Sequence, residues 1–249
     1  MCIRDSSELY AARYRSGETP FVVRLPFSRQ NSDDSEEGVF DFEAGKAEMQ
    51  DIVESSNASC HNGVDLSVKG AKSAWWAERE TLDKRLHELL LNIENIWLGG
   101  FKGVLSSQVT DRELRDRFRK AFDAMLDCHL PSRQAAKGRA KKLALDDGIL
   151  DLFIQLGADQ DGMIDLDEPV ADLLYFVVDM LQFNREPNAY DEIDFDAMAV
   201  EVMDALRMHH DAAAEQQTSD QHLILVLDKR LQCFPWESLP CLELSLIHI

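Results

Sequence analysis

The sequence lacks any apolar run of 18 residues or more, the length that a membrane-spanning helix requires. It shows no internal repeat and no charged-then-apolar leader, so we expect neither a repeat architecture nor a secretory route. Its five cysteines are odd in number and have no CxxC spacing. This argues against a disulfide framework and a zinc site and predicts reduced thiols. We therefore expect a protein of the cytoplasm and nucleus that makes no membrane contact.

Basic residues are also scarce, because 26 Lys and Arg stand against 46 Asp and Glu, for a net charge of −20. The imbalance is uneven: residues 71–142 hold 15 basic and 10 acidic side chains, whereas residues 143–217 hold 2 and 19. Such an acidic stretch repels phosphates, so no direct nucleic-acid binding is expected. The basic residues 112–142 form either a solvated helical face or a surface for an acidic partner.

Apolar spacing predicts one strand and then a helical block. Residues 20–27 lie between prolines and read as a strand at a sheet edge. Helical periodicity marks residues 40–55, 71–98, 111–128, 145–156, 169–183 and 195–210, separated by polar loops that include residues 28–38, 56–70 and 184–192.

Local signals define the ends of two of these helices. Gly99 and Gly100 end the helix over residues 71–98. Thr110 is the expected N-cap of the next helix, with Glu113 completing a capping box, and Pro131 ends that helix. In the first helix, the adjacent Trp75 and Trp76 should both pack, one inward and one against a neighbouring element.

A different element begins after the linker over residues 209–221. The apolar residues 223–227 predict a strand buried on both faces, and a proline-rich turn follows. A strand of this kind needs neighbours to pair its backbone, so poor solubility is expected for the chain alone. A strand, a helical block and a second strand together favour an α/β fold with a helical insertion.

The pattern LVLDKxLxxxPWESLPCL of residues 225–242 resembles the strand and turn that open the active domain of the separase family. These are caspase-like cysteine endopeptidases that cleave cohesin. Residues 72–105, KSAWWAERETLDKRLHELLLNIENIWLGGFKGVL, resemble the helical signature preceding that domain. The sequence most resembles those of fungal members.

The resemblance implies an α/β, caspase-like protease fragment with a large helical insertion. Residues 8–217 would form an inactive, protease-like, substrate-side domain, and residues 218–243 the first strand and turn of the active domain. Residues 1–7 and 244–249 fit no surrounding pattern and look like translated adapter sequence, so we expect a fragment cut at both ends.

The resemblance further implies a function in chromosome segregation. A member of the family cleaves the kleisin subunit of cohesin after arginine at the onset of anaphase. It is held inactive by securin and uses no cofactor. Securin and the kleisin subunit are therefore the expected partners.

The family's catalytic histidine stands before a glycine, and its catalytic cysteine follows one. None of the seven histidines here precedes a glycine, and no cysteine follows one. We therefore expect the dyad to lie beyond this chain, which by itself should cleave nothing. Cys233 and Cys241, near the prolines of the turn, are expected to be small buried side chains.

Residues in the turn should support the neighbouring catalytic loops of the parent protein rather than react. No GxSxG surrounds Ser238, which argues against a catalytic serine. We expect Trp236 to anchor the turn and its polar neighbours to bond within it; the complete predicted support set is Asp228, Pro235, Trp236, Glu237 and Ser238.

The acidic residues 157–168 resemble a calcium-binding EF-hand loop. Its weak candidate ligands are Asp159, Asp161, Asp165 and Glu168. The first ligand position is Gly157, however, and Pro169 follows the last. An acidic loop that complements the next helix dipole is therefore favoured over a calcium site. A calcium-binding helical protein and a non-enzymatic interaction module are the alternatives to a separase fragment.

Overall fold

The computed structural model forms two compact units, Met1–Leu98 with Ile224–Ile249, and Gly99–Leu223. It describes residues 1–4, 7–17, 19–30, 40–61, 69–106, 110–136, 142–156, 167–214 and 223–245. The break at Leu98 was not expected from the sequence. The predicted boundaries at residues 8, 217 and 243 refer to domains of a longer protein and stay predictions.

The first unit contains a three-stranded antiparallel sheet in the order β1–β2–β3, formed by Cys2–Arg4, Glu8–Arg13 and Phe21–Pro26. Leu9 pairs with Leu25. Both side chains are buried, because alternate residues of a strand share one face. The predicted edge strand is confirmed as β3. Cys2–Arg4, which the sequence analysis set aside, pair with β2 as β1.

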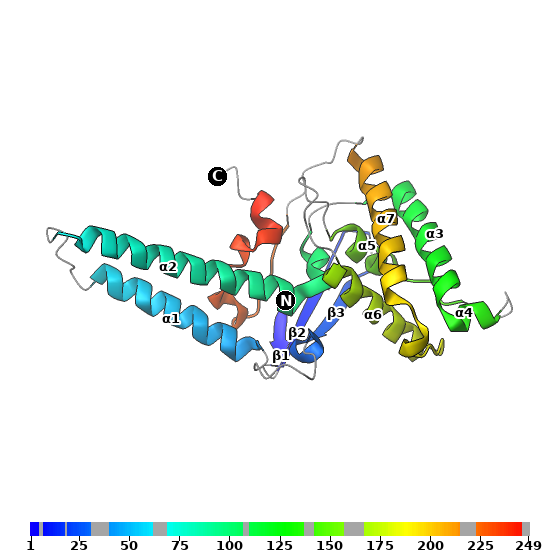
Figure 1. Ribbon diagram of the computed structural model, residues 1–249, viewed down its shortest axis with the longest axis horizontal. Coiled ribbons are helices and arrows are strands. Elements are labelled where there is room, and N and C mark those ends of the chain that lie inside the picture. The colour runs from blue at the N-terminus through cyan, green and yellow to red at the C-terminus, as the bar shows by residue number, and fades with distance from the viewer. Residues whose placement is uncertain are drawn as a thin grey trace. The chain divides into compact units, whose positions relative to one another are not determined.

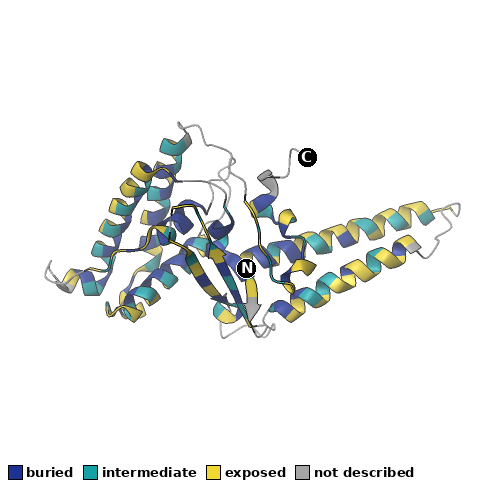
Figure 2. Cartoon of the chain, turned by 180° about the vertical axis from the view of Figure 1, so that it is seen from behind, coloured by how far each residue is buried: buried dark blue, intermediate teal, exposed yellow. Residues whose placement is uncertain are grey.

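Two long helices of the first unit lie side by side as an antiparallel hairpin (Figure 1): α1, Phe42–His61, and α2, Ala71–Asn92. Exposed and half-buried residues prevail along both (Figure 2). The predicted helix over residues 40–55 is confirmed. The loop predicted from residue 56 is wrong as far as residue 61, where α1 continues.

The buried end of α2 departs from α-helical geometry. Residues Ile93–Leu98 form a π-helical segment, a geometry frequent at functional sites. Gly99 then takes the left-handed conformation with φ of 53°, as predicted for a residue that ends a helix. A short helix, Phe27–Gln30, follows β3.

The predicted buried strand at residues 223–227 is wrong. The segment is extended but forms no strand, and Ile224 and Val226 are 83% and 78% exposed, while Leu225 and Leu227 are half-buried. The amino group of Met1 donates a hydrogen bond to the Val226 carbonyl of this segment over 2.7 Å. An apolar segment becomes a buried strand only where other strands pair with it. Among the described residues no strand pairs with this segment.

Three short helical turns complete the first unit, Leu231–Cys233, Trp236–Ser238 and Pro240–Ser245. The second unit begins with Gly99–Leu105 and contains α3 to α7, at Arg112–His129, Pro131–Ala136, Asp147–Ile154, Asp167–Phe183 and Phe195–Ala214, with a short turn at Tyr190–Glu192.

Within the second unit, α3 and α7 lie side by side, and α6 contacts α7 (Figure 1). The apolar stripe predicted for the helix over residues 169–183 is confirmed, because every member is fully buried in α6: Val170, Leu173, Leu174, Val177, Val178 and Leu181. None of the described helices is long and apolar enough to cross a membrane.

Two end signals of the second unit need correction. Asp111, not Thr110, caps α3, because its carboxylate accepts from the amides of Glu113 and Leu114 over 2.8 and 3.1 Å. A carboxylate at this position also complements the helix dipole. Pro131 follows α3 as predicted, but it also begins α4, since proline suits the first position of a helix.

Candidate functional site

The turn that carries the predicted support residues begins at Asp228. Its carboxylate oxygen accepts from the Arg230 amide over 2.9 Å, and its carbonyl accepts from the Leu231 amide over 2.9 Å. An Asp side chain that bonds two residues ahead fixes a turn without help from other elements. The chain therefore changes direction directly after the extended segment.

Trp236 anchors the next part of the turn. Its side chain is buried, and the indole Nε1 donates to the Leu231 carbonyl over 2.7 Å. The Ser238 amide donates to the Pro235 carbonyl over 2.9 Å. Trp236 thus combines apolar burial with a satisfied donor, whereas Glu237 is exposed.

An aromatic cluster lies beneath this turn: Phe42, Phe234, Trp97 and Trp236. The Phe234 ring meets the Trp97 ring edge-on at 5.3 Å and the Phe42 ring at 6.0 Å. Trp97 is fully buried, and its Nε1 donates to the Phe40 carbonyl over 2.9 Å. Because these rings come from α1, the π-helical segment and the C-terminal turn, they join three distant parts of the sequence.

Glu94 is a supporting residue that the sequence analysis missed. This buried carboxylate accepts from the Cys241 amide over 2.8 Å, so it holds the last helical turn against the π-helical segment. A charged residue in a helix ordinarily faces water. A signal was nevertheless present, since Glu94 follows Leu90 by four residues on the apolar stripe of α2.

The cysteines in the turn do not have the environment predicted for them. Cys233 and Cys241 are exposed, not buried. Desolvation by neighbouring atoms nevertheless raises the pKa of the Cys233 thiol above its ordinary value, which disfavours the reactive thiolate. Its thiol donates to the Arg230 carbonyl over 3.2 Å. In the described ranges no hydrogen bond joins a cysteine to a histidine.

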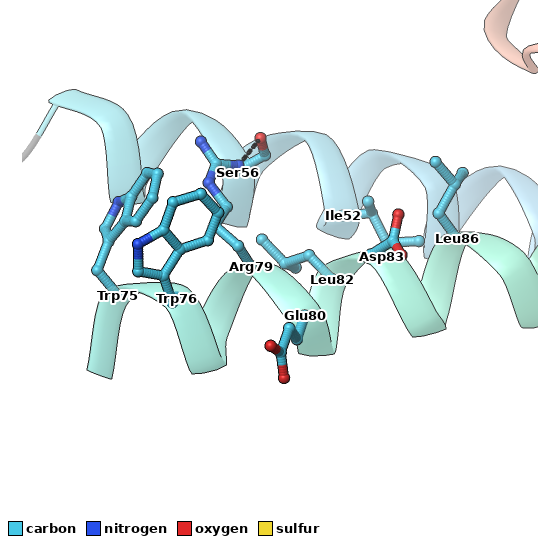
Figure 3. A pocket seen from close by; sticks show the side chains of 9 residues that line it. All are labelled: Ile52, Ser56, Trp75, Trp76, Arg79, Glu80, Leu82, Asp83 and Leu86. Carbon is cyan, nitrogen blue, oxygen red and sulfur yellow. Dashed lines mark hydrogen bonds between the residues drawn. The ribbon is translucent and has the colours of Figure 1, made fainter. Parts of the chain in front are cut away.

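A groove of about 500 Å³ opens on the hairpin of α1 and α2 (Figure 3). The Trp75 indole donates to the Ser59 carbonyl over 3.3 Å, while Trp76 remains largely exposed. The expectation that both indoles pack is therefore wrong for Trp76. The groove is lined by Ile52, Ser56, Trp75, Trp76, Arg79, Glu80, Leu82, Asp83 and Leu86. The lining contains neither cysteine nor histidine.

The candidate calcium loop falls mostly outside the described residues, which exclude Asp159, Asp161 and Asp165. Glu168 lies exposed in the first turn of α6, beside Asp167. Acidic side chains there complement the helix dipole. Among the described residues no group of three acidic, histidine or cysteine side chains is placed to hold a metal ion. Calcium binding stays a prediction.

Comparisons with known proteins give one consistent match. The family model "Separin, protease domain" matches residues 4–248. The chain is 45% identical to a separin of Emericella nidulans over 241 residues and 36% identical to one of Schizosaccharomyces pombe over 242 residues. It covers 12% and 13% of the lengths of these curated relatives.

Solved structures agree. A crystal structure of the Saccharomyces cerevisiae separase–securin complex at 2.6 Å matches 90% of this chain with a TM-score of 0.74 and 29% identity. A second structure of that complex, at 3.0 Å, matches 82% with a TM-score of 0.73 and 33% identity. The chain covers 14% of each matched separase chain.

These matches define the class of protein, a caspase-like α/β protease region into which helices are inserted, and they confirm the predicted fold class. The chain belongs to the separin, or separase, protease-domain family, which is a family of cysteine endopeptidases. The expected similarity to fungal members is also confirmed.

Proposed function

We propose that this chain is a part of a longer separase that cleaves the kleisin subunit of cohesin after arginine and so releases sister chromatids. The observation that carries the proposal is the family match over residues 4–248. The small share of each relative that the chain covers supports a longer parent.

Within that parent, the chain would supply the substrate-side domain and the opening strand and turn of the active domain. Asp228 and Trp236 would shape the turn, and Glu94 would hold its far end. The catalytic histidine and cysteine would lie beyond residue 243, where a thiolate would attack the scissile carbonyl with histidine assistance. The extended residues 223–227 would gain strand partners from the same parent.

Securin is the proposed inhibitor, supported by the similarity to the separase of two separase–securin complexes. The cohesin kleisin subunit is the proposed substrate. Activity of this kind in the parent would place it in the cytoplasm and nucleus.

The first test is to sequence the transcript across the codons after Glu243. The proposal expects a continuing frame with a His-Gly and, further on, a Gly-Cys. The extended chain should then cut an arginine-containing kleisin peptide, and serine in place of the cysteine after glycine should abolish the cut. The 249-residue chain is the matched control and should leave the peptide intact. An extended chain that carries both dipeptides but cuts nothing would contradict the proposal.

A further inference from the structure

The second unit carries an exposed aromatic cluster where α6 faces the start of α7: Tyr175, Tyr190 and Phe195. The rings of Tyr175 and Phe195 stack at 4.2 Å, with 28° between their planes. The Tyr190 ring lies 6.1 Å from both. Tyr175 and Tyr190 are 48% and 44% exposed, so their ring surfaces remain open to solvent.

Core packing does not explain this cluster. Tyr175 lies outside the buried stripe of α6, and Tyr190 belongs to the short turn before α7. Stacked aromatic rings ordinarily gain most when they leave water. A cluster that stays half exposed therefore presents flat, electron-rich surface to a partner.

Acidic side chains surround these rings. Residues 186–204 contain seven Asp and Glu and no Lys or Arg. Two carboxylates near the rings have structural roles, because Asp179 accepts from the Tyr190 hydroxyl and Asp194 accepts from the Ala197 amide. Three others, Asp191, Glu192 and Asp196, are exposed and make no ion pair with any described residue.

We propose that the rings of Tyr175, Tyr190 and Phe195, with the carboxylates of Asp191, Glu192 and Asp196, form a docking surface for an arginine-rich segment of another protein. Guanidinium groups stack on aromatic faces and bond carboxylates with two parallel N–H groups. Arginine satisfies both features of this surface, whereas lysine provides only a point charge. The same carboxylates repel nucleic acids and anionic lipids.

A test must distinguish binding at this surface from non-specific attraction, because a net charge of −20 attracts any polycation. We would measure the binding of two peptides of equal charge, one of nine arginines and one of nine lysines, to the 249-residue chain. The measurement is fluorescence anisotropy at low and moderate salt. The surface should prefer the arginine peptide by about tenfold, since only guanidinium stacks on the rings.

Two sets of substitutions, each with its own control, test whether the peptide binds at this surface. Tyr175→Ala with Tyr190→Ala should weaken the arginine peptide about tenfold and remove the preference over lysine, whereas Tyr14→Ala, at a 75% exposed tyrosine of the first unit, should change neither. Neutralising Asp191, Glu192 and Asp196 should weaken binding about tenfold. The same charge change at Glu78, Glu80 and Asp83 of α2 is its control.

The proposal would be overturned if the two charge changes weakened binding equally. It would also be overturned if substituting the tyrosines left the affinity for the arginine peptide unchanged. Sedimentation velocity decides a further alternative, that the basic residues 112–142 of a second copy occupy the surface. Concentration-dependent association that disappears in the Tyr175→Ala variant would replace a separate partner by self-association and overturn the proposal. Thermal melting of each variant separates loss of binding from loss of folding.

Discussion

At the scale of single residues, tertiary packing changes the pKa of a buried histidine. His209 lies on α7, is buried, and presents its ring edge-on to Phe118 at 6.3 Å. Neither of its ring nitrogens has a hydrogen-bond partner among the described residues. Burial lowers the pKa of His209 from 6.5 to about 4, with a smaller contribution from His210, while Asp111 opposes the shift.

This environment predicts a loss of stability in mild acid. Between pH 6.5 and 4 the unfolded chain binds a proton at His209 that the native chain does not, so the free energy of unfolding falls as the pH falls. The contribution is on the order of 2 kcal/mol. The neighbouring His210, whose pKa is also lowered by burial, acts in the same direction.

Urea denaturation at pH 7 and pH 5 checks the prediction. His209→Leu should flatten the dependence on pH, because its side chain cannot take up a proton. His87→Gln, at an exposed histidine of α2, should leave it unchanged. A His209→Leu chain with the dependence of the wild type would contradict the assignment.

At the scale of elements, the C-terminal turn is held by contacts with helices that precede it by more than a hundred residues. Phe234 contacts Trp97 and Phe42, and the Cys241 amide bonds Glu94. The π-helical segment is the common support, because Trp97 and Glu94 both belong to it. Gly45 permits this packing, since a Cβ there would lie 2.8 Å from the Trp97 ring.

We predict that Trp236→Phe destabilises the chain by about 1 kcal/mol, because the Leu231 carbonyl loses its indole donor while most apolar contact is kept. Trp236→Ala should cost about 3–5 kcal/mol, since it also leaves a cavity. Denaturation midpoints in urea measure both values. Trp76→Phe, at an exposed indole of α2, is the control and should shift the midpoint little; equal shifts at the two positions would refute the anchoring role of Trp236.

At the scale of the whole molecule, each compact unit has its own buried core, and one apolar segment stays uncovered. Ile224 and Val226 are alternate residues of an extended segment, and both are exposed. Their neighbours Leu225 and Leu227 are half-buried. An exposed, extended apolar segment of this kind invites strand pairing between copies.

Ile224→Thr with Val226→Lys should therefore raise the soluble fraction of the expressed chain several-fold, because a charge on the exposed side opposes pairing. The fraction that remains soluble after centrifugation measures the effect. Val200→Lys, at an exposed apolar residue of α7, adds the same charge elsewhere; an equal gain from it would show that net charge, not the segment, controls solubility.

The sequence alone determined the features that depend on short spacing. Periodic apolar residues located the helices, as the buried stripe of α6 shows, and the motif around Trp236 indicated the family that the comparisons confirmed. Tertiary structure decided the burial of Glu94, the exposure of residues 224 and 226, and the meeting of Tyr175 with Phe195. The reason is physical: spacing specifies which side of an element is apolar, whereas burial depends on what distant parts of the chain place against it.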